Sequence, residues 1–252
     1  MFLRLVQLSI NTEYESTFRQ VYNIVVLPQL QRLVGCRMAG LIKSNTDRGK
    51  FISLTLWDKK KQAEDYEKSD VSKKLSEHIE QFLSESSEWK LQLSEDSKVE
   101  YKPVLESPSR TNYVVAVRSH NNKSKLAEST GMYIRIVSVK IQPDKIKEFK
   151  KIYSKEILPN LETAEGCSFA YLTENLKNDS EFLSFSVWED KSFADQYELS
   201  GKFTQLTDKV KHTFSKFYLW KMELEQSSKG KINTSEDMKI DNYTLITGKS
   251  FG

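Results

Sequence analysis

The chain has 252 residues, 38% hydrophobic and 11% aromatic, enough for one large domain or two ordinary domains with packed cores. Its 38 basic and 35 acidic side chains leave a formal net charge of +3, which argues against a nucleic-acid-binding protein. The low counts of glycine (9) and proline (5) exclude collagen-like and low-complexity classes, and 2 cysteines are too few for a disulfide scaffold.

The first segment of the chain is a strand, expected at residues 2–10 from its aliphatic and β-branched side chains. It could be mistaken for a secretion signal, but Arg4 and Gln7 interrupt it and no small-residue cleavage site follows. No apolar run approaches the roughly 18 residues that a membrane span needs. We therefore expect a cytoplasmic protein in a reducing compartment, with no membrane partner and no nucleic-acid partner.

A helix is expected after this strand, because apolar residues recur at helical spacing from Phe18 to Leu33. Pro28 is expected to kink or end this helix, since proline removes a backbone donor. Gly35 then suits a turn of positive φ before a second strand. The third strand, 51–57, alternates Ile, Leu and Leu with Phe, Ser, Thr and Trp.

Two helices are predicted next, a short one at Lys60–Lys68 and a longer one with apolar residues from Val71 to Phe82 on one face. Strands near 99–105 and 113–118 are expected to complete the sheet. The resulting β-α-β-β-α-β order is that of a ferredoxin-like unit, a sheet with helices on one face.

The chain contains this unit twice. Shifting the sequence by 131 positions aligns residues 1–93 with 132–224 without a gap, and 26 of the 93 positions are identical. Repetition at this length indicates a duplicated domain rather than a solenoid of short repeats. We predict a domain at 1–118, a polar linker at 119–131 and a second domain at 132–252, whose last strand lies near 243–248. The open sheet faces of the two copies can then cover each other.

A recurring set of residues resembles a known family. The strand Ser53-Leu54-Thr55-Leu56-Trp57 is followed by Ala63, Tyr66 and Ser69, and a helix with Leu27-Pro28 and then Gly35-Cys36 precedes it. This pattern resembles the antibiotic biosynthesis monooxygenase (ABM) domain of the dimeric α+β barrel superfamily, over 1–118 and 132–248. Family members pair two chains into a barrel. The resemblance therefore implies an α+β fold of two tandem ferredoxin-like domains forming an intrachain pseudo-dimeric α+β barrel.

The resemblance also implies a function. Some family members are cofactor-independent monooxygenases that oxidise polycyclic phenols to quinones, so the expected partner is a small aromatic ligand, with no cofactor and no metal. The substrate phenolate supplies electrons to oxygen, so the site must bind the aromatic, help to deprotonate it and exclude water. Two alternatives stay open: a non-catalytic small-molecule-binding or stress-associated protein on the same fold, and a haem-binding or haem-degrading relative.

Seven candidate catalytic residues follow from the repeat and the resemblance. Trp57 and Trp188 could stack on a planar ligand or anchor the next helix, and Tyr66 and Tyr197 could exchange a proton or simply pack. Arg4 and Arg135 could hold a phenolate or form an ion pair with a helix carboxylate. Gln7 is closest to the catalytic amide of relatives, whereas the second copy has Ser138, which favours the first copy as the active half.

The strand face formed by Phe51, Ser53, Thr55 and Trp57 is expected to border a helix-covered cavity, according to the resemblance. The alternative is that this face packs sheet against sheet. Oligomeric state is also open, since the internal pair could leave a monomer or its sheet edges could recruit another chain.

The haem alternative has less support in the residues. Haem-degrading relatives use an Asn, a Trp and an axial His at the places of Gln7, Tyr66 and Ser76 in the first copy and of Ser138, Tyr197 and Thr207 in the second. His78 and His212 are expected on the surface instead. Cys36 and Cys167 occupy matching positions and are interpreted as small apolar fillers rather than a redox pair.

Overall fold

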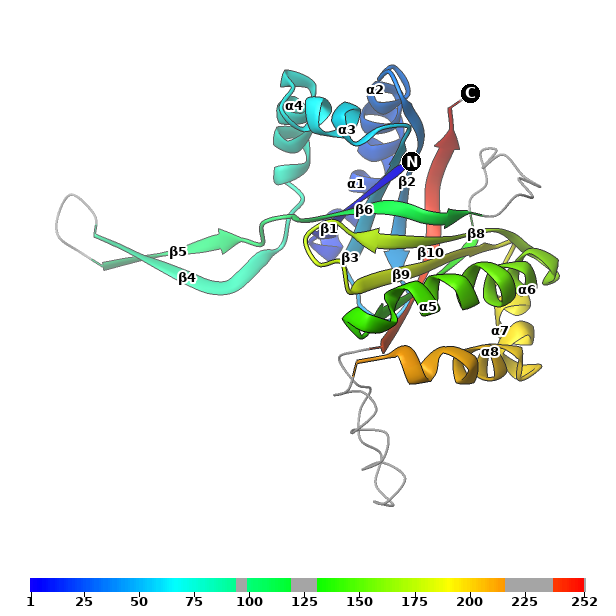
Figure 1. Cartoon of the computed structure of the whole chain (residues 1–252). Helices are drawn as coiled ribbons and strands as arrows, with labels where there is room; N and C mark the ends of the chain where they lie inside the picture. Colours follow the sequence, from blue (N-terminus) through cyan, green and yellow to red (C-terminus); the bar gives the residue numbers. More distant parts are fainter. Residues whose placement is uncertain (94–98, 119–130, 216–237, 252) are drawn as a thin grey trace.

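The fold is a closed barrel of eight strands with helices on its outside (Figure 1). The computed structural model describes residues 1–93, 99–118, 131–215 and 238–251, and within these the side chains of 86–103 are not described. The strand order around the barrel is β1-β3-β2-β10-β7-β9-β8-β6. The expected α+β fold with an internal pseudo-dimeric barrel is thus confirmed. The predicted linker lies outside the described residues, apart from Gly131.

The first half contributes four neighbouring barrel strands in the order β6-β1-β3-β2, the order of a ferredoxin-like sheet. These are β1 (Phe2–Ser9), β2 (Cys36–Ser44), β3 (Lys50–Trp57) and β6 (Ser109–Arg118). Its helices are α1 (Glu15–Val21), α2 (Leu27–Gln31), α3 (Lys60–Glu67) and α4 (Asp70–Glu80).

The second half repeats this order as β10-β7-β9-β8. Its strands are β7 (Tyr133–Lys140), β8 (Cys167–Asn175), β9 (Glu181–Trp188) and β10 (Met238–Ser250). Its helices are α5 (Ile146–Ile152), α6 (Leu158–Thr163), α7 (Lys191–Leu199) and α8 (Lys202–Val210). The two groups of helices lie on different sides of the barrel (Figure 1).

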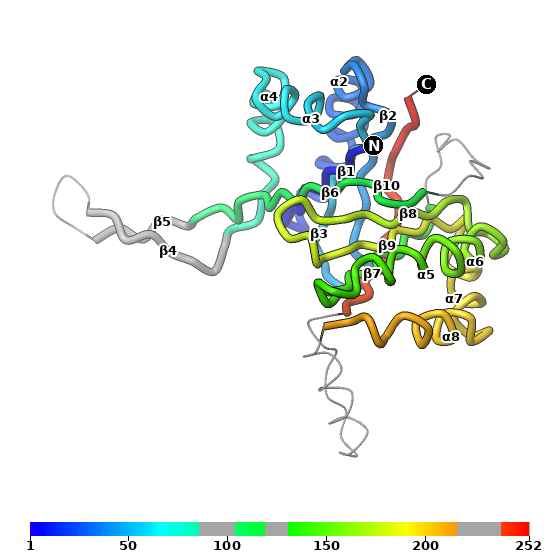
Figure 2. Tube along the Cα trace, viewed as in Figure 1, coloured from blue at the N-terminus to red at the C-terminus, as the bar shows by residue number. Residues whose placement is uncertain are grey.

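The halves are joined by their last strands. In each half the last strand pairs with the first strand of its own half and also with the second strand of the other half: β6 pairs with β1 and β8, and β10 pairs with β7 and β2. Figure 2 shows β10 running alongside the first-half strands. The chain therefore closes its barrel by itself, without a second molecule.

Strand alternation gives each barrel strand two different environments. On β3, Ile52, Leu54 and Leu56 point into the barrel, where they join a core shared by both halves. Phe51 and Trp57, on the opposite face, belong to a separate core under the first-half helices. The face with Phe51 and Trp57 is therefore covered by helices, as one of the two interpretations predicted. The sheet-against-sheet alternative is wrong for this face, because Ile52, Leu54 and Leu56 on the other face of β3 form the contact between the sheets.

Two local predictions need correction. The helix does not end at Pro28, because a π-helical turn at Tyr22–Val26 precedes α2 and places this proline in the first turn of α2, where a missing donor is tolerated. The strand expected near 99–105 is not part of the barrel: β5 (Val99–Leu105) pairs only with β4 (Glu85–Leu93) in a separate two-stranded sheet.

The turns before β2 and β8 have the positive φ that the sequence predicts. Gly35 has φ of 81° and Gly166 has φ of 72°. At Gly166 an added Cβ would also lie 2.2 Å from Cγ of Phe193, whereas at Gly201, with φ of 75°, it would meet nothing within 4 Å. Alanine at Gly201 would therefore add backbone strain alone, whereas alanine at Gly166 would add backbone strain and a steric clash.

We expect Gly201→Ala to lower the free energy of unfolding by about 1 kcal/mol, the cost of a left-handed alanine. Gly166→Ala should cost about 2 kcal/mol or more, because it adds the clash with Phe193. Urea denaturation of both variants beside the wild type measures the difference. Equal losses would show that Phe193 moves away freely.

Candidate functional site

A cavity of about 400 Å³ lies between the first-half sheet and its helices. Its apolar walls include Val6 on β1, Leu30 on α2 and Leu75 and Ile79 on α4. Polar and charged side chains also line it: Arg4, Ser53, Thr55, Tyr66, Glu67, Ser72, Lys73, Ser76, Glu77, Glu80, Ser107 and Arg110. A pocket of this size with a few convergent polar groups is the usual form of a small-molecule site.

The corresponding space in the second half is nearly filled, with a cavity of about 60 Å³. Larger side chains occupy it at equivalent positions of the repeat. Phe203 stands where the first half has Ser72, and Phe214 stands where it has Leu83. The two halves share a fold, but only the first-half cavity can admit a molecule larger than a few waters.

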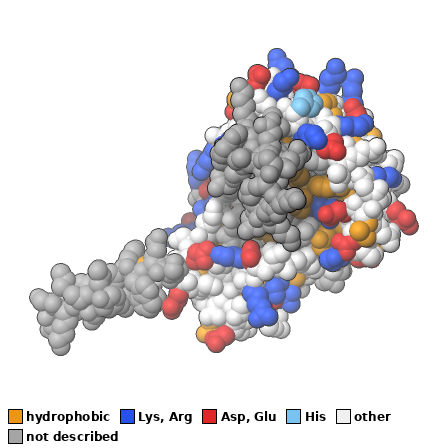
Figure 3. Space-filling model, turned by 90° about the horizontal axis from the view of Figure 1, so that it is seen from below, with side chains coloured by type: hydrophobic (Ala, Val, Ile, Leu, Met, Phe, Trp, Pro, Cys, Tyr) orange, Lys and Arg blue, Asp and Glu red, His pale blue; other side chains and the backbone are white. Residues whose placement is uncertain are grey.

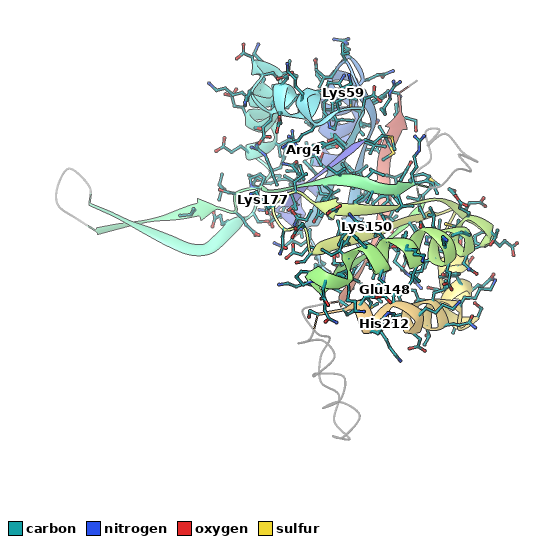
Figure 4. The ribbon with its side chains drawn as sticks, viewed as in Figure 1. Arg4, Lys59, Glu148, Lys150, Lys177 and His212 are labelled. Carbon is teal, nitrogen blue, oxygen red and sulfur yellow. The ribbon has the colours of Figure 1, made fainter. Side chains whose placement is uncertain are left out.

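Arg4, labelled in Figure 4, is buried. Three partners hold its guanidinium. Its Nη2 donates to Oε2 of Glu67 at 2.7 Å, Nη1 to the carbonyl of Ala63 at 2.9 Å, and Nε to Oδ1 of Asn112 at 3.0 Å. Asn112 is reached because it is the direct cross-strand neighbour of Arg4. Burial lowers the pKa of Arg4, and the charge of Glu67 opposes this shift. The ion-pair interpretation of Arg4 is the one its geometry supports.

Glu67 also faces a second guanidinium. Nη1 of Arg110, at the start of β6, lies 3.5 Å from Oε1 of Glu67. This corner of the cavity thus has two guanidinium groups and one carboxylate, with a local formal charge of +1. Such a corner favours a bound anion over a bound cation.

Arg135 repeats the Arg4 arrangement only in part. Its Nη2 donates to Glu198 at 2.8 Å and its Nε to Asn242 at 3.4 Å. Its Nη1 is buried without a hydrogen-bond partner among the described residues, while the guanidinium lies 5.7 Å from the ring centroid of Phe203. The phenylalanine that fills the second cavity therefore also covers its arginine.

The two candidate tryptophans are packing residues with one hydrogen bond each. Trp57 is fully buried, stacks on Tyr66 with ring centroids 5.5 Å apart, and donates through Nε1 to Oγ1 of Thr55 at 2.9 Å. Trp188 packs against Tyr197 in a tilted arrangement, with ring centroids 5.2 Å apart, and donates through Nε1 to Oγ of Ser186 at 3.0 Å. Tyr66 lines the first cavity. Its pKa is raised by burial, an effect that Ser72 and Arg4 partly offset, so it is a protonated phenol at neutral pH.

Gln7 is separated from the other candidates. Alternation on β1 turns Arg4, Val6 and Leu8 toward the helices, and the side chain of Gln7 toward the opposite face. Gln7 is exposed and borders a different pocket, of about 220 Å³. The amide difference between Gln7 and Ser138 thus does not concern the cavity. The first half stands out instead through its smaller side chains.

Of the positions considered for a haem ligand, only those without a histidine lie at the cavities. Ser76 lines the first cavity and Thr207 the second, but neither is a strong haem ligand. His78 is exposed, with Nδ1 2.7 Å from the carbonyl of Lys74 in its own helix. His212 lies on the surface with Nε2 2.8 Å from Glu148 (Figure 4).

Cys36 and Cys167 are buried free thiols. Burial raises the pKa of each to about 12, so both remain protonated and unreactive at neutral pH.

Sequence reasoning missed Glu67, Ser72, Arg110 and Asn112. Two of them carried a signal, because Glu67 and Asn112 recur in the second copy as Glu198 and Asn242. Ser72 and Arg110 do not recur, and their importance follows from the cavity that they line.

Comparison with known families supports the assignment of the fold. Residues 132–208 match the family model described as antibiotic biosynthesis monooxygenase. This segment is an ABM domain. The first half has the same strand order and shares 26 of 93 aligned residues with the second, so the chain carries the ABM-like unit twice. No curated protein matches the chain.

Solved structures share this architecture over the whole chain. A proposed monooxygenase from Fusobacterium nucleatum covers 100% of this chain and 94% of its own, with a TM-score of 0.70 and 13% identity. One from Lactobacillus acidophilus covers 100% and 96%, with a TM-score of 0.65 and 8% identity. An anthrone oxidase-like protein covers 100% and 93%, with a TM-score of 0.59 and 10% identity. At these identities the likeness establishes the two-copy fold and no activity.

The surface agrees with the balanced charge of the sequence. On the face in Figure 3, Lys and Arg side chains are interspersed with Asp and Glu. Within the described part of the chain, no helix has the length and apolar character to cross a membrane.

Buried tyrosines predict a loss of stability at alkaline pH. The pKa values of Tyr22 and Tyr153 are raised by burial, whereas in the unfolded chain tyrosine ionises near pH 10. Above about pH 10 the unfolded chain therefore binds fewer protons than the folded chain, and the free energy of unfolding falls by about 1.4 kcal/mol per pH unit for each such group.

Tyr153→Phe should reduce this slope in urea denaturation between about pH 9 and pH 11, since one buried phenol is removed. Tyr14→Phe is the control for removing a phenol from the surface, because Tyr14 is 47% exposed. An unchanged slope in Tyr153→Phe would contradict the assignment.

Proposed function

We propose that the first-half cavity binds a hydroxylated aromatic small molecule and oxidises it with molecular oxygen, without a cofactor. The observation that carries the proposal is the contrast between the cavities, about 400 Å³ in the first half and about 60 Å³ in the second. The first is large enough for a molecule of two or three fused rings. The ABM resemblance suggests the type of reaction. The cavity walls hold charged and hydroxyl side chains that can bind and deprotonate a phenol, among them Arg4, Tyr66 and Glu67.

The charged corner favours the anionic form of such a substrate. Loss of the phenol or enol proton leaves a negative oxygen, and Arg4 and Arg110 provide positive charge beside it. Glu67, held in place by both arginines, is a carboxylate in the same corner that can accept the proton. Tyr66, which stays protonated, can donate a hydrogen bond to the substrate oxygen.

The reaction balances for a substrate with an oxidisable ring carbon para to the ionised oxygen. The substrate anion transfers electrons to O₂, and one oxygen atom bonds to that carbon. That carbon loses its hydrogen and becomes a carbonyl, and the ionised oxygen becomes the other carbonyl. The second oxygen atom leaves as water with this hydrogen and the proton released when the hydroxyl ionised. The substrate supplies all four electrons that reduce O₂, so the protein only has to bind, orient and deprotonate it.

We also propose that residues 1–118 and 132–252 are the two domains and that the chain acts in the cytoplasm as a monomer. Closure of the barrel within one chain supports the monomer, because the barrel itself has no free strand edge. A further homodimer is the alternative, and the separate sheet of β4 and β5 has the free edges through which it could form.

A second candidate function is ligand binding without turnover. The observation in its favour is the full engagement of Arg4 by Glu67, Ala63 and Asn112, which suits a structural role. In that case the same cavity binds an aromatic molecule and oxygen is not consumed.

Oxygen uptake over a panel of anthrone-like and quinol-like phenols tests the proposal. Ser72→Phe should lower uptake at least about tenfold, because it places in the first cavity the side chain that fills the second. Phe203→Leu is the matched control in the second half and should retain the wild-type rate. Thermal melts confirm that both variants fold.

Uptake that Ser72→Phe leaves unchanged would contradict the assignment to this cavity. Binding of panel compounds without any uptake, lost in Ser72→Phe, would favour the second candidate.

A further inference from the structure

Two hydroxyl groups on β3, Ser53 and Thr55, line the first-half cavity two residues apart on the same strand face. Each is engaged in one hydrogen bond behind the cavity wall. The direction of that bond decides what each hydroxyl can still offer to a ligand.

Thr55 is left as a donor. The indole Nε1 of Trp57 can only donate, so Oγ1 of Thr55 accepts from it at 2.9 Å. The hydroxyl hydrogen of Thr55 then remains, and no acceptor for it occurs among the described residues. Thr55 is 5% exposed, so a donor without a partner is costly there unless a ligand or a water accepts from it.

Ser53 is left as an acceptor. The phenol oxygen of Tyr22 lies 3.1 Å from the carbonyl of Gly40 and 2.7 Å from Oγ of Ser53. A carbonyl can only accept, so the Tyr22 proton points to Gly40 and Ser53 must donate to Tyr22 to satisfy both contacts. The hydroxyl hydrogen of Ser53 is used in this way, so Ser53, which lines the cavity, has only lone pairs left for a ligand.

In the second half, Ser184 keeps the bond that Ser53 makes, to Tyr153 at 2.8 Å, and the difference lies at Ser186. Ser186, the equivalent of Thr55, accepts from Trp188 at 3.0 Å and donates to the carbonyl of Arg135 at 3.5 Å. The Ser186 hydroxyl thus has a carbonyl acceptor only at the long end of hydrogen-bond distance, where Phe203 closes the cavity. An unused donor occurs in the half that has room for a ligand.

We propose that Ser53 and Thr55 select the ligand of this cavity, which must carry a hydroxyl that donates to Ser53 and a carbonyl or phenolate oxygen that accepts from Thr55. This inference rests on the binding site proposed above. Residues two apart on a strand are separated by roughly 7 Å. The two ligand oxygens therefore lie on opposite sides of a fused-ring system, with the flat rings against the apolar wall of Val6 and Leu75.

Naphthalene ketones, whose fluorescence responds to the polarity of their surroundings, provide a direct binding test. The probes are 6-hydroxy-2-acetylnaphthalene with both groups, 6-methoxy-2-acetylnaphthalene without the hydroxyl donor, and 2-naphthol without the ketone. The wild type should bind the hydroxy ketone roughly tenfold more tightly than either probe that lacks one group, the effect expected for one lost hydrogen bond in a buried site.

Variants assign each preference to one side chain. Ser53→Ala should abolish the preference for hydroxyl over methoxy and keep the preference for the ketone. Thr55→Val should do the reverse, and Thr55→Ser, which retains a hydroxyl for Trp57 and for the ligand, should restore the wild-type pattern. The wild-type comparison of the three probes stands even if Thr55→Val does not fold.

The outcomes separate this inference from the proposed function. Binding that is lost in Ser72→Phe but shows no preference among the probes would overturn the roles of Ser53 and Thr55 and leave the cavity as the site. Binding of all probes that Ser72→Phe leaves unchanged, or no binding at all, would count against the cavity as the site and against this inference with it.

Discussion

The structure depends on the pairing of each half's last strand with the other half. Because β6 pairs with β8 and β10 pairs with β2, the two sheets become one closed barrel. Closure gives every barrel strand an inner face in the shared core and an outer face under helices. Arg4 on β1 and Ser53 and Thr55 on β3 lie on the outer face, so they meet a ligand beneath the helices of their own half.

Duplication allowed the two halves to differ while the barrel was kept. The barrel needs both sheets, and their inner faces are apolar in both copies. The spaces under the helices are not needed for closure, and the second is filled by Phe203 and Phe214. A filled space adds buried apolar area to the core, whereas an open space costs packing and is retained where it has a use. The first half has kept that open space together with the polar groups around it.

The same buried polar unit supports both spaces. An arginine on the first strand of each half donates hydrogen bonds to an asparagine on the last strand and to a glutamate on α3 or α7. Breaking such a unit would leave a buried charge unpaired, so it ties the helix to the sheet. In the first half Arg110 also contacts Glu67, and all three charged side chains line the cavity.

The sequence by itself determined the repeat and the order of the strands and helices that each copy contributes to the barrel, because periodicity and internal identity are visible without the fold. It left open whether the face of β3 with Phe51 and Trp57 lies under helices or against the other sheet, and the structure decided for the helices. The sequence also singled out Arg4 and Tyr66. Only the tertiary structure decided that β5 leaves the barrel, that Gln7 faces away from Arg4, and that one cavity is open and the other filled. Those facts depend on which side chains from distant elements meet in space. The exchange of Ser72 for Phe203 is one substitution in an alignment, but in the folded chain it closes a site.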